Sequence, residues 1–179
     1  MDHFVFTTEE DCIEKLKTDD DPTYIFSWVP DDKKTLKLCE IACSISYDAI
    51  EYVPFEKRTK EVCEAAVWND GLALEHVPFA IKQSTDIDIY SDAVNSNGMA
   101  LRFVPRAERD YNICMDAVMN CGLALQFVPE DVRTFEMYQK AVKNNAFAVR
   151  WVPEDMLTID MYKAAVKTLS LQKVICLCE

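Results

Sequence analysis

The dipeptide Val-Pro recurs along this chain at a nearly constant interval, and that interval limits what the chain can fold into. Successive pairs are separated by 24, 24, 27, 24 and 24 residues. The six pairs are Val29-Pro30, Val53-Pro54, Val77-Pro78, Val104-Pro105, Val128-Pro129 and Val152-Pro153. A fixed interval of this length is typical of a protein built from repeated supersecondary units. The chain therefore divides into aligned units, once three extra residues are allowed between Pro78 and Asp86.

Three columns of residues come into register when the units are aligned. The first contains residues that favour a helix N-cap, where a side-chain oxygen accepts a hydrogen bond from a free backbone N–H: Thr35, Thr59, Asp86, Asp110, Thr134 and Thr158. Four residues later comes a cysteine or tyrosine, at Cys39, Cys63, Tyr90, Cys114, Tyr138 and Tyr162. Three residues further on there is always an alanine, at Ala42, Ala66, Ala93, Ala117, Ala141 and Ala165. The spacing predicts an N-cap, one buried helical face, and close approach of neighbouring helices at the alanines.

Each unit is expected to contain two helices. The first runs for about ten residues from its cap and ends near Gly71, Gly98 or Gly122, where a left-handed C′ residue belongs. The second is a shorter apolar run of about six residues; strand and helix both fit so short a run, and its central alanine favours helix. The Val-Pro pair then ends it, because the residue before a proline is pushed out of the α region. We expect the valine of each pair to be buried.

These elements predict an all-α fold, an α-solenoid of about seven short helix-turn-helix repeats of 24 residues. Neither helix can bury its apolar side alone at this length, whereas stacking against a neighbour buries both. We expect a single domain over residues 1–179. It would have a degenerate N-terminal unit at 1–30, where Thr8 caps the first helix, core repeats at 31–153, and a degenerate C-terminal unit at 154–179.

The last two units share the pattern Val-Pro-Glu-Asp-x-x-Thr-x-(Glu/Asp)-Met-Tyr-x-x-Ala-Val. This pattern resembles an uncharacterised family of short helical repeats, a domain of unknown function that occurs in effector-like proteins of intracellular bacteria, in protists and algae, and in giant viruses. The resemblance covers nearly the whole chain and implies a helical-repeat fold. It implies no catalytic residues, because the family has no assigned activity.

The charge of the chain narrows the class of partner. The formal net charge is −12, from 31 acidic and 19 basic side chains. Such a surface repels nucleic-acid phosphates and anionic membranes and favours a basic protein partner, although it also serves solubility alone. The first residues resemble no signal peptide, and no apolar run approaches the ~18 residues of a membrane span. We therefore expect a cytoplasmic location, or the host cytosol for a delivered effector, with the eight cysteines reduced.

The sequence offers little for catalysis. Of its two histidines, His3 lies in the N-terminal tail, and His76 fills a position that is aromatic in other units. Most cysteines fall in the apolar columns, and the close pair Cys176-x-Cys178 lacks the second pair or the histidines of a zinc site. Walker loops and dinucleotide fingerprints are absent. We therefore expect no enzyme, no cofactor, no metal site and no small-molecule substrate.

Charged clusters are the candidate binding surface. The acidic members are Asp19, Asp20, Asp21, Asp31, Asp32, Glu130, Asp131, Glu154 and Asp155, and turn capping is the simpler explanation for those that follow Val-Pro. The basic members are Arg58, Arg109 and Arg133, which with Lys34 form a ladder four residues after the prolines and are expected to pair with neighbouring carboxylates. The first hypothesis is a protein–protein interaction module, such as an acidic inhibitor, immunity protein or adaptor. An effector-type enzyme on a helical-repeat scaffold and a structural or virion component are the alternatives.

Overall fold

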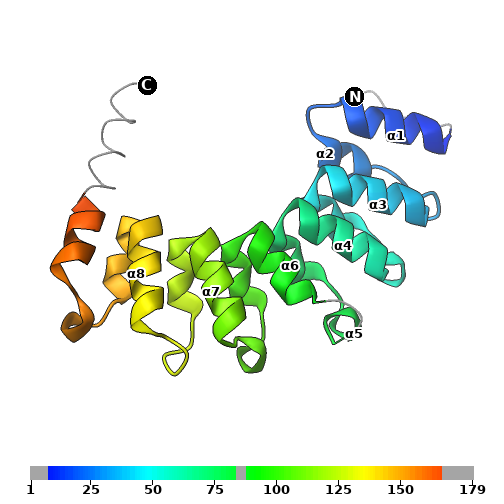
Figure 1. Cartoon of the computed structure of the whole chain (residues 1–179). Helices are drawn as coiled ribbons and strands as arrows, with labels where there is room; N and C mark the ends of the chain where they lie inside the picture. Colours follow the sequence, from blue (N-terminus) through cyan, green and yellow to red (C-terminus); the bar gives the residue numbers. More distant parts are fainter. Residues whose placement is uncertain (1–7, 84–87, 167–179) are drawn as a thin grey trace, which may run out of the picture. The chain divides into compact units, whose positions relative to one another are not determined.

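The computed structural model describes residues 8–83 and 88–166, and every regular element in these ranges is a helix (Figure 1). The α-helices are α1 (Glu9–Thr18), α2 (Pro22–Ser27), α3 (Leu36–Ile45), α4 (Lys60–Asn69), α5 (Phe79–Lys82), α6 (Ile89–Ser96), α7 (Tyr111–Asn120) and α8 (Phe135–Asn144). The 3₁₀-helices are η1 (Tyr47–Tyr52), η2 (Phe55–Lys57), η3 (Gly71–His76), η4 (Gly98–Phe103), η5 (Arg106–Glu108), η6 (Gly122–Phe127), η7 (Ala146–Trp151) and η8 (Glu154–Met156). Residues 159–166 are also helical. The all-helical prediction is confirmed.

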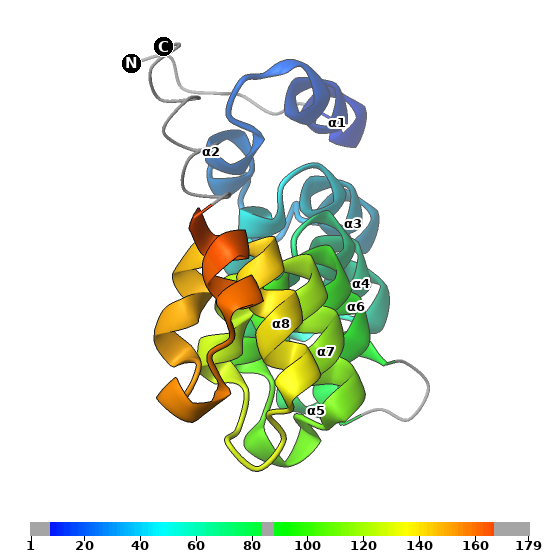
Figure 2. The same ribbon diagram turned by 60° about the vertical axis from the view of Figure 1, so that its left-hand side comes forward.

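The chain forms two compact units, Met1–Ser96 and Asn97–Glu179. In the first unit α3 contacts α1 and α4, and α4 contacts α6; Figure 2 shows α3, α4 and α6 side by side. In the second unit α7 lies beside α8, and η4, η6 and η7 follow one another along these helices. The expectation of one domain over residues 1–179 stays a prediction.

The long helices begin at the predicted caps. The Thr35 hydroxyl accepts from the backbone N–H three residues on at 3.2 Å, and Asp110 does the same at 2.9 Å. Thr8, Thr134 and Thr158 make the equivalent bond, whereas Thr59 occupies the cap without it. Asp86 lies outside the described residues. In that unit α6 begins at Ile89, and the carboxylate of Asp88 accepts from the Ser91 N–H at 3.1 Å.

The predicted columns form the core of each unit. All six Val-Pro valines are buried, and so is every residue of the alanine column. The cysteine/tyrosine column is buried as far as Tyr138, whereas Tyr162 is exposed. The Val-Pro joint also behaves as predicted, because Val53 has an extended backbone at the end of η1 with ψ of 124°.

The glycines do not serve the purpose that the sequence suggested. Among the described residues no glycine has a positive φ, so the predicted left-handed C′ conformation is wrong. A Cβ on Gly71 would collide with the carbonyl oxygen of Ala93, and one on Gly98 would collide with that of Ala117. Gly122 stands in the same relation to the next alanine of the column. Glycine is required here because the neighbouring backbone leaves no room for a side chain.

The second segment of each unit is helical, as predicted, but of the tight 3₁₀ type. A polar side chain explains how it begins: the Asp70 carboxylate accepts from the Leu72 N–H at 2.9 Å, two residues on. Asn97 and Asn145 make the same bond at 3.0 Å at the start of η4 and η7. These short side chains favour a turn over a continuing α-helix. Asn145 thus both ends α8 and starts η7.

Asparagines at the ends of the long helices hold consecutive repeats together, and the sequence analysis did not anticipate them. Asn144, the last residue of α8, accepts from the Gly122 N–H at 2.8 Å and donates to the Met119 carbonyl at 3.0 Å. Asn120 accepts in the same way from Gly98 at 2.7 Å, and Asn69 from Tyr47 at 3.0 Å. Each amide thus satisfies backbone groups that a helix end leaves unpaired.

Candidate functional site

The acidic residues predicted as a binding surface are all exposed. They are Asp19, Asp20, Asp21, Asp31 and Asp32 in the first unit, and Glu130, Asp131, Glu154 and Asp155 in the second. Some also shape the backbone: the Asp21 carboxylate accepts from the Tyr24 N–H at 2.9 Å and so caps α2. Glu154 and Asp155 lie in the first turn of η8, where negative charge is favourable. The same acidic residues therefore stabilise the starts of helical turns and remain exposed to solvent.

Lys34, the first member of the predicted basic ladder, points inward. Only 4% of its surface is exposed. Its Nζ donates to the Tyr52 carbonyl at 2.7 Å and to the Asp31 carboxylate at 2.8 Å, and it lies 5.2 Å from the centre of the Phe26 ring. The Lys34 ammonium, through this hydrogen bond, holds the pKa of Asp31 below its usual value. The predicted pairing with a neighbouring carboxylate is confirmed at this position.

The arginines of the ladder bond instead to backbone carbonyl oxygens. Arg109 donates from Nη1 to the Phe127 carbonyl at 2.7 Å and from Nε to the Val104 carbonyl at 2.8 Å. Arg58 forms the same set of bonds in the first unit, and Arg133 bonds within its own repeat. Burial lowers the pKa of Arg109, which stays a cation at neutral pH. Within the described residues neither Arg58 nor Arg109 forms an ion pair with a carboxylate, so the predicted pairing is wrong for them; their guanidinium groups instead join the end of η1 to that of η3 and the end of η4 to that of η6.

The starts of α7 and α8 form one edge of the second unit that combines acids with exposed aromatic side chains. Tyr111 and Phe135 are the first residues of these helices and are 42% and 43% exposed. The Tyr111 hydroxyl lies 3.3 Å from the Glu136 carboxylate, and Arg106 pairs with Asp131 at 3.4 Å, so consecutive starts are neighbours. We use the name helix-start edge for the acidic and aromatic residues at or just before the starts of α7, α8 and the helix at 159–166: Tyr111, Glu130, Asp131, Phe135, Glu136, Glu154 and Asp155.

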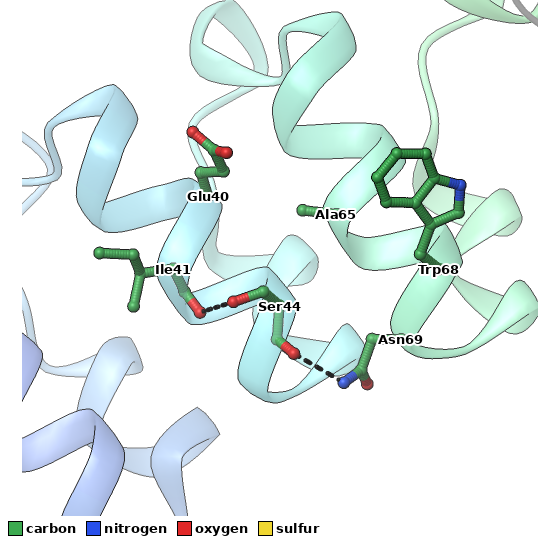
Figure 3. Close-up of a pocket in the computed structure, with 6 residues that line it drawn as sticks. All are labelled: Glu40, Ile41, Ser44, Ala65, Trp68 and Asn69. Carbon is green, nitrogen blue, oxygen red and sulfur yellow. Dashed lines mark hydrogen bonds between the residues drawn. The ribbon is translucent and has the colours of Figure 1, made fainter.

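A second surface lies in the first unit, in an open groove between α3 and α4 (Figure 3). We call it the α3–α4 groove; its volume is about 570 Å³, and its walls are Glu40, Ile41 and Ser44 on α3 and Ala65, Trp68 and Asn69 on α4. None of its residues was among the binding residues predicted from the sequence. A signal was present, because Trp68 stands in a column that holds small, polar or flexible residues elsewhere, at Ser44, Asn95, Met119 and Lys143.

The four cysteines of the apolar columns are poor candidates for nucleophiles. Cys39, Cys43, Cys63 and Cys114 lie in the apolar columns and are buried. Burial raises the pKa of Cys43 and Cys63 to about 12 and that of Cys114 to about 11. A thiol with so high a pKa is protonated at neutral pH, whereas the thiolate is the reactive form.

The remaining candidates for chemistry are few. The half-buried His76 has its Nε2 3.4 Å from a carboxylate oxygen of Glu51, and its carbonyl accepts from Arg58, which fits a packing position. Within residues 8–83 and 88–166, no group of three or more His, Cys, Asp or Glu side chains is placed to hold a metal ion. His3, Cys176 and Cys178 lie outside the described residues.

Comparison with known proteins adds one match. Residues 110–157 match a family described as a domain of unknown function (DUF4116). The match covers about a quarter of the chain and includes the whole helix-start edge. No curated protein and no solved structure matches this sequence. A wider family membership and its taxonomic range stay predictions.

The helices were also compared with the dimensions of a membrane. Over the described part of the chain, none of them has both the length and the apolar content that a bilayer span requires. The cytoplasmic location expected from the sequence stays a prediction.

Proposed function

We propose that this chain is an α-solenoid of about seven helix-turn-helix repeats of 24 residues, and that it works as a protein–protein interaction module. Bonds that recur at one sequence offset support the repeat arrangement. The ladder residues Lys34, Arg58 and Arg109 each donate to a carbonyl 18 residues further on. Asn69, Asn120 and Asn144 each accept from an N–H 22 residues earlier. Such repetition between nearest neighbours is what a solenoid requires.

The proposal that the partner is basic rests on the hydrogen bonds that the basic ladder residues already make within the fold. Lys34, Arg58 and Arg109 donate hydrogen bonds to backbone carbonyl groups of the fold. The acidic clusters stay exposed, and the formal net charge of the chain is −12. A surface with an excess of one charge sign attracts oppositely charged partners and speeds their encounter.

The helix-start edge is the best candidate for the contact itself. Its carboxylates would supply charge complementarity, while Tyr111 and Phe135 supply exposed apolar surface. Aromatic side chains beside charged groups are the composition that binding interfaces favour. An inhibitor, an immunity protein or an adaptor would each use such an edge.

Affinity capture at graded salt tests this function. The wild-type chain would be immobilised and exposed to an extract of its native cell, and bound proteins would be eluted with increasing NaCl. We expect partners of basic surface that leave as salt screens the interaction. The double variant Glu154→Gln with Asp155→Asn should retain less of them.

The matched control carries Glu14→Gln with Glu75→Gln, which removes two exposed acids away from the edge and should bind as the wild type does. Bound proteins that remain unchanged from low to high salt would contradict the basic-partner proposal. Equal capture by both double variants would move the contact away from the helix-start edge.

A further inference from the structure

The α3–α4 groove contains a large aromatic side chain that is mostly exposed. Trp68 is 65% exposed, although an indole ring gains free energy when it is removed from water. The neighbouring Ala65 is too short to cover it, and Figure 3 shows the ring beside the hollow that this alanine leaves. A large aromatic left uncovered beside a hollow indicates a place where another molecule docks.

The backbone around the groove is held by hydrogen bonds that do not depend on a ligand. Asn69 donates to the Ser44 carbonyl at 2.8 Å and accepts from the Tyr47 N–H at 3.0 Å, which ties the end of α4 to the end of α3. The Ser44 hydroxyl donates to the Ile41 carbonyl at 2.8 Å. The Trp68 carbonyl accepts from Ser96 at 3.4 Å. A preformed groove loses little conformational entropy on binding.

The charge at the groove is negative. Glu40 is exposed on the α3 wall, and among the described residues no basic side chain forms an ion pair with it. Glu64 precedes Trp68 by four residues, so the two share one face of α4. An indole face and carboxylates together favour a cation, through cation–π attraction and charge-assisted hydrogen bonds.

We propose that the α3–α4 groove binds an arginine side chain from a basic segment of a protein partner. The planar guanidinium stacks on the indole of Trp68 and donates hydrogen bonds to the carboxylate of Glu40. Arginine fits better than lysine, because its flat group can stack and donate at the same time. This inference rests on the proposed function, for which it names the group recognised and a second point of contact.

The test uses the full chain, ¹⁵N-labelled, and a short acetylated and amidated peptide of alternating arginine and glycine. The indole N–H resonance of Trp68 is assigned by its loss in Trp68→Leu and followed during titration. We expect a saturable shift of this resonance. A peptide with citrulline in place of arginine keeps the shape and loses the charge, and it should bind at least about tenfold more weakly, as expected when a charged donor is lost.

Two variants and two controls complete the test. Trp68→Leu and Glu40→Gln, with the peptide's own ¹⁵N-arginine side-chain resonances as the readout, should each weaken binding by about 3- to 30-fold, the range for losing one cation–π or charge-assisted contact. Trp28→Leu removes another exposed tryptophan from the same unit, 55% exposed, and Glu14→Gln removes another exposed acid; both should bind as the wild type does.

The outcomes separate this inference from the proposed function. Peptide binding that leaves the Trp68 resonance unmoved, or equal binding of the citrulline peptide, overturns the groove as an arginine site. If the shifts instead appear at Tyr111 and Phe135, the proposed function stands and the groove does not. If the groove binds the peptide but capture yields no salt-sensitive basic partner, the groove assignment stands and the proposed function fails.

Discussion

At the scale of single residues, two backbones in the second unit approach each other closely at Gly98. The Ala117 carbonyl of α7 occupies the space that a side chain at Gly98 would need. Two small residues, one from each neighbouring repeat, therefore set how closely the repeats approach. Because no described glycine has a positive φ, the requirement is for space and not for an unusual backbone conformation.

Gly98→Ala should therefore destabilise the chain. At a negative φ with open space, the same change stabilises a protein by about 0.4–1 kcal/mol, because it restricts the unfolded chain. Here the added methyl meets Ala117 and Cys121, and we expect a loss of about 1–3 kcal/mol from overpacking. Urea unfolding of the two proteins measures it. Met119→Ala, at a residue that is 56% exposed, is the control, and a more stable Gly98→Ala would show that the contact is loose.

The buried thiols make stability depend on pH in the alkaline range. The pKa of Cys43 is raised to about 12 by burial, whereas a thiol in the unfolded chain ionises near pH ~8.5. Above that pH the unfolded state loses a proton that the folded state keeps, so the free energy of unfolding falls as pH rises towards 12. Below pH ~8.5 both states keep the proton, so the full contribution of this thiol to stability is present.

Cys43→Val should flatten this decline. Valine fills the same column in the neighbouring repeats, at Val67, Val94, Val118 and Val142, so the change should be tolerated. Removing one thiol should lessen the slope by up to about 1.4 kcal/mol per pH unit between pH ~9 and ~12. Urea unfolding from pH 8 to 11 under reducing conditions measures both slopes. Parallel curves would mean that Cys43 ionises equally in the two states.

Residues that bond within their own helix could be predicted from the sequence, whereas residues that bond to a neighbouring repeat could not. Thr35 and Asp110 were predictable caps, because an N-cap bond is made within the same helix. The asparagine Asn144 bonds to Gly122 in the preceding repeat, and only the recurrence of asparagine at that column could have revealed it. Trp68 was visible as an exception to its column, but its groove depends on the small Ala65 beside it.

At the scale of elements, the short 3₁₀-helices are held at their ends by guanidinium groups. Arg109 bonds to carbonyls at the end of η4 and also to the last residue of η6, 18 residues further on. One side chain thus bonds to carbonyl groups at the ends of both η4 and η6. A helix end otherwise leaves such carbonyl groups to water. The bonds are charge-assisted and partly buried, conditions that strengthen them.

Arg109→Lys should cost more stability than a conservative change normally does. A lysine has one nitrogen and cannot reach the Val104 and Phe127 carbonyls together, so at least one partly buried acceptor loses its bond. We expect a loss of about 1.5–3 kcal/mol, the range for hydrogen bonds to charged groups. Thermal and urea unfolding measure it. Arg106→Lys is the matched control, because that guanidinium is exposed and pairs with Asp131. Similar losses of stability in both variants would contradict the role of Arg109 in joining the ends of η4 and η6.

The type of the second helix illustrates what periodicity leaves open. The run Leu123-Ala124-Leu125 predicted a helix of about six residues, and η6 has that length. At six residues the apolar spacing does not separate i→i+3 from i→i+4 bonding. A side-chain bond is present at the start of η3, η4 and η7, at Asp70, Asn97 and Asn145, but η1 and η6 are 3₁₀-helices without one, so this bond favours the turn and does not by itself set the helix type.

At the scale of the whole molecule, the basic ladder residues and the acidic clusters differ in how far they are exposed to solvent. The ladder cations lie within the fold against carbonyl oxygens, while the acidic clusters and Glu40 are exposed. The exposure of these acids could be predicted from their turn positions. The inward direction of Arg58 and Arg109 could not, since their partners are backbone atoms and leave no pattern of residue types.

A chain with a formal net charge of −12 repels itself, and this repulsion should lower the stability of the folded chain at low salt. Charges interact over about 30 Å at 0.01 M salt and over about 8 Å at 0.15 M, so the melting temperature should rise across this range. Asp20 lies in the acidic run 19–21 and is exposed, which makes it suitable for a graded test. Asp20→Asn removes one negative charge and Asp20→Lys removes one and adds a positive charge, so the rise should be largest for the wild type and smallest for the lysine variant. Bonds between the ladder and carbonyls have neutral acceptors and are mostly partly buried, so they should contribute little to the difference. An equal rise in all three proteins, or a fall with salt, would mean that pairing among surface charges outweighs their repulsion.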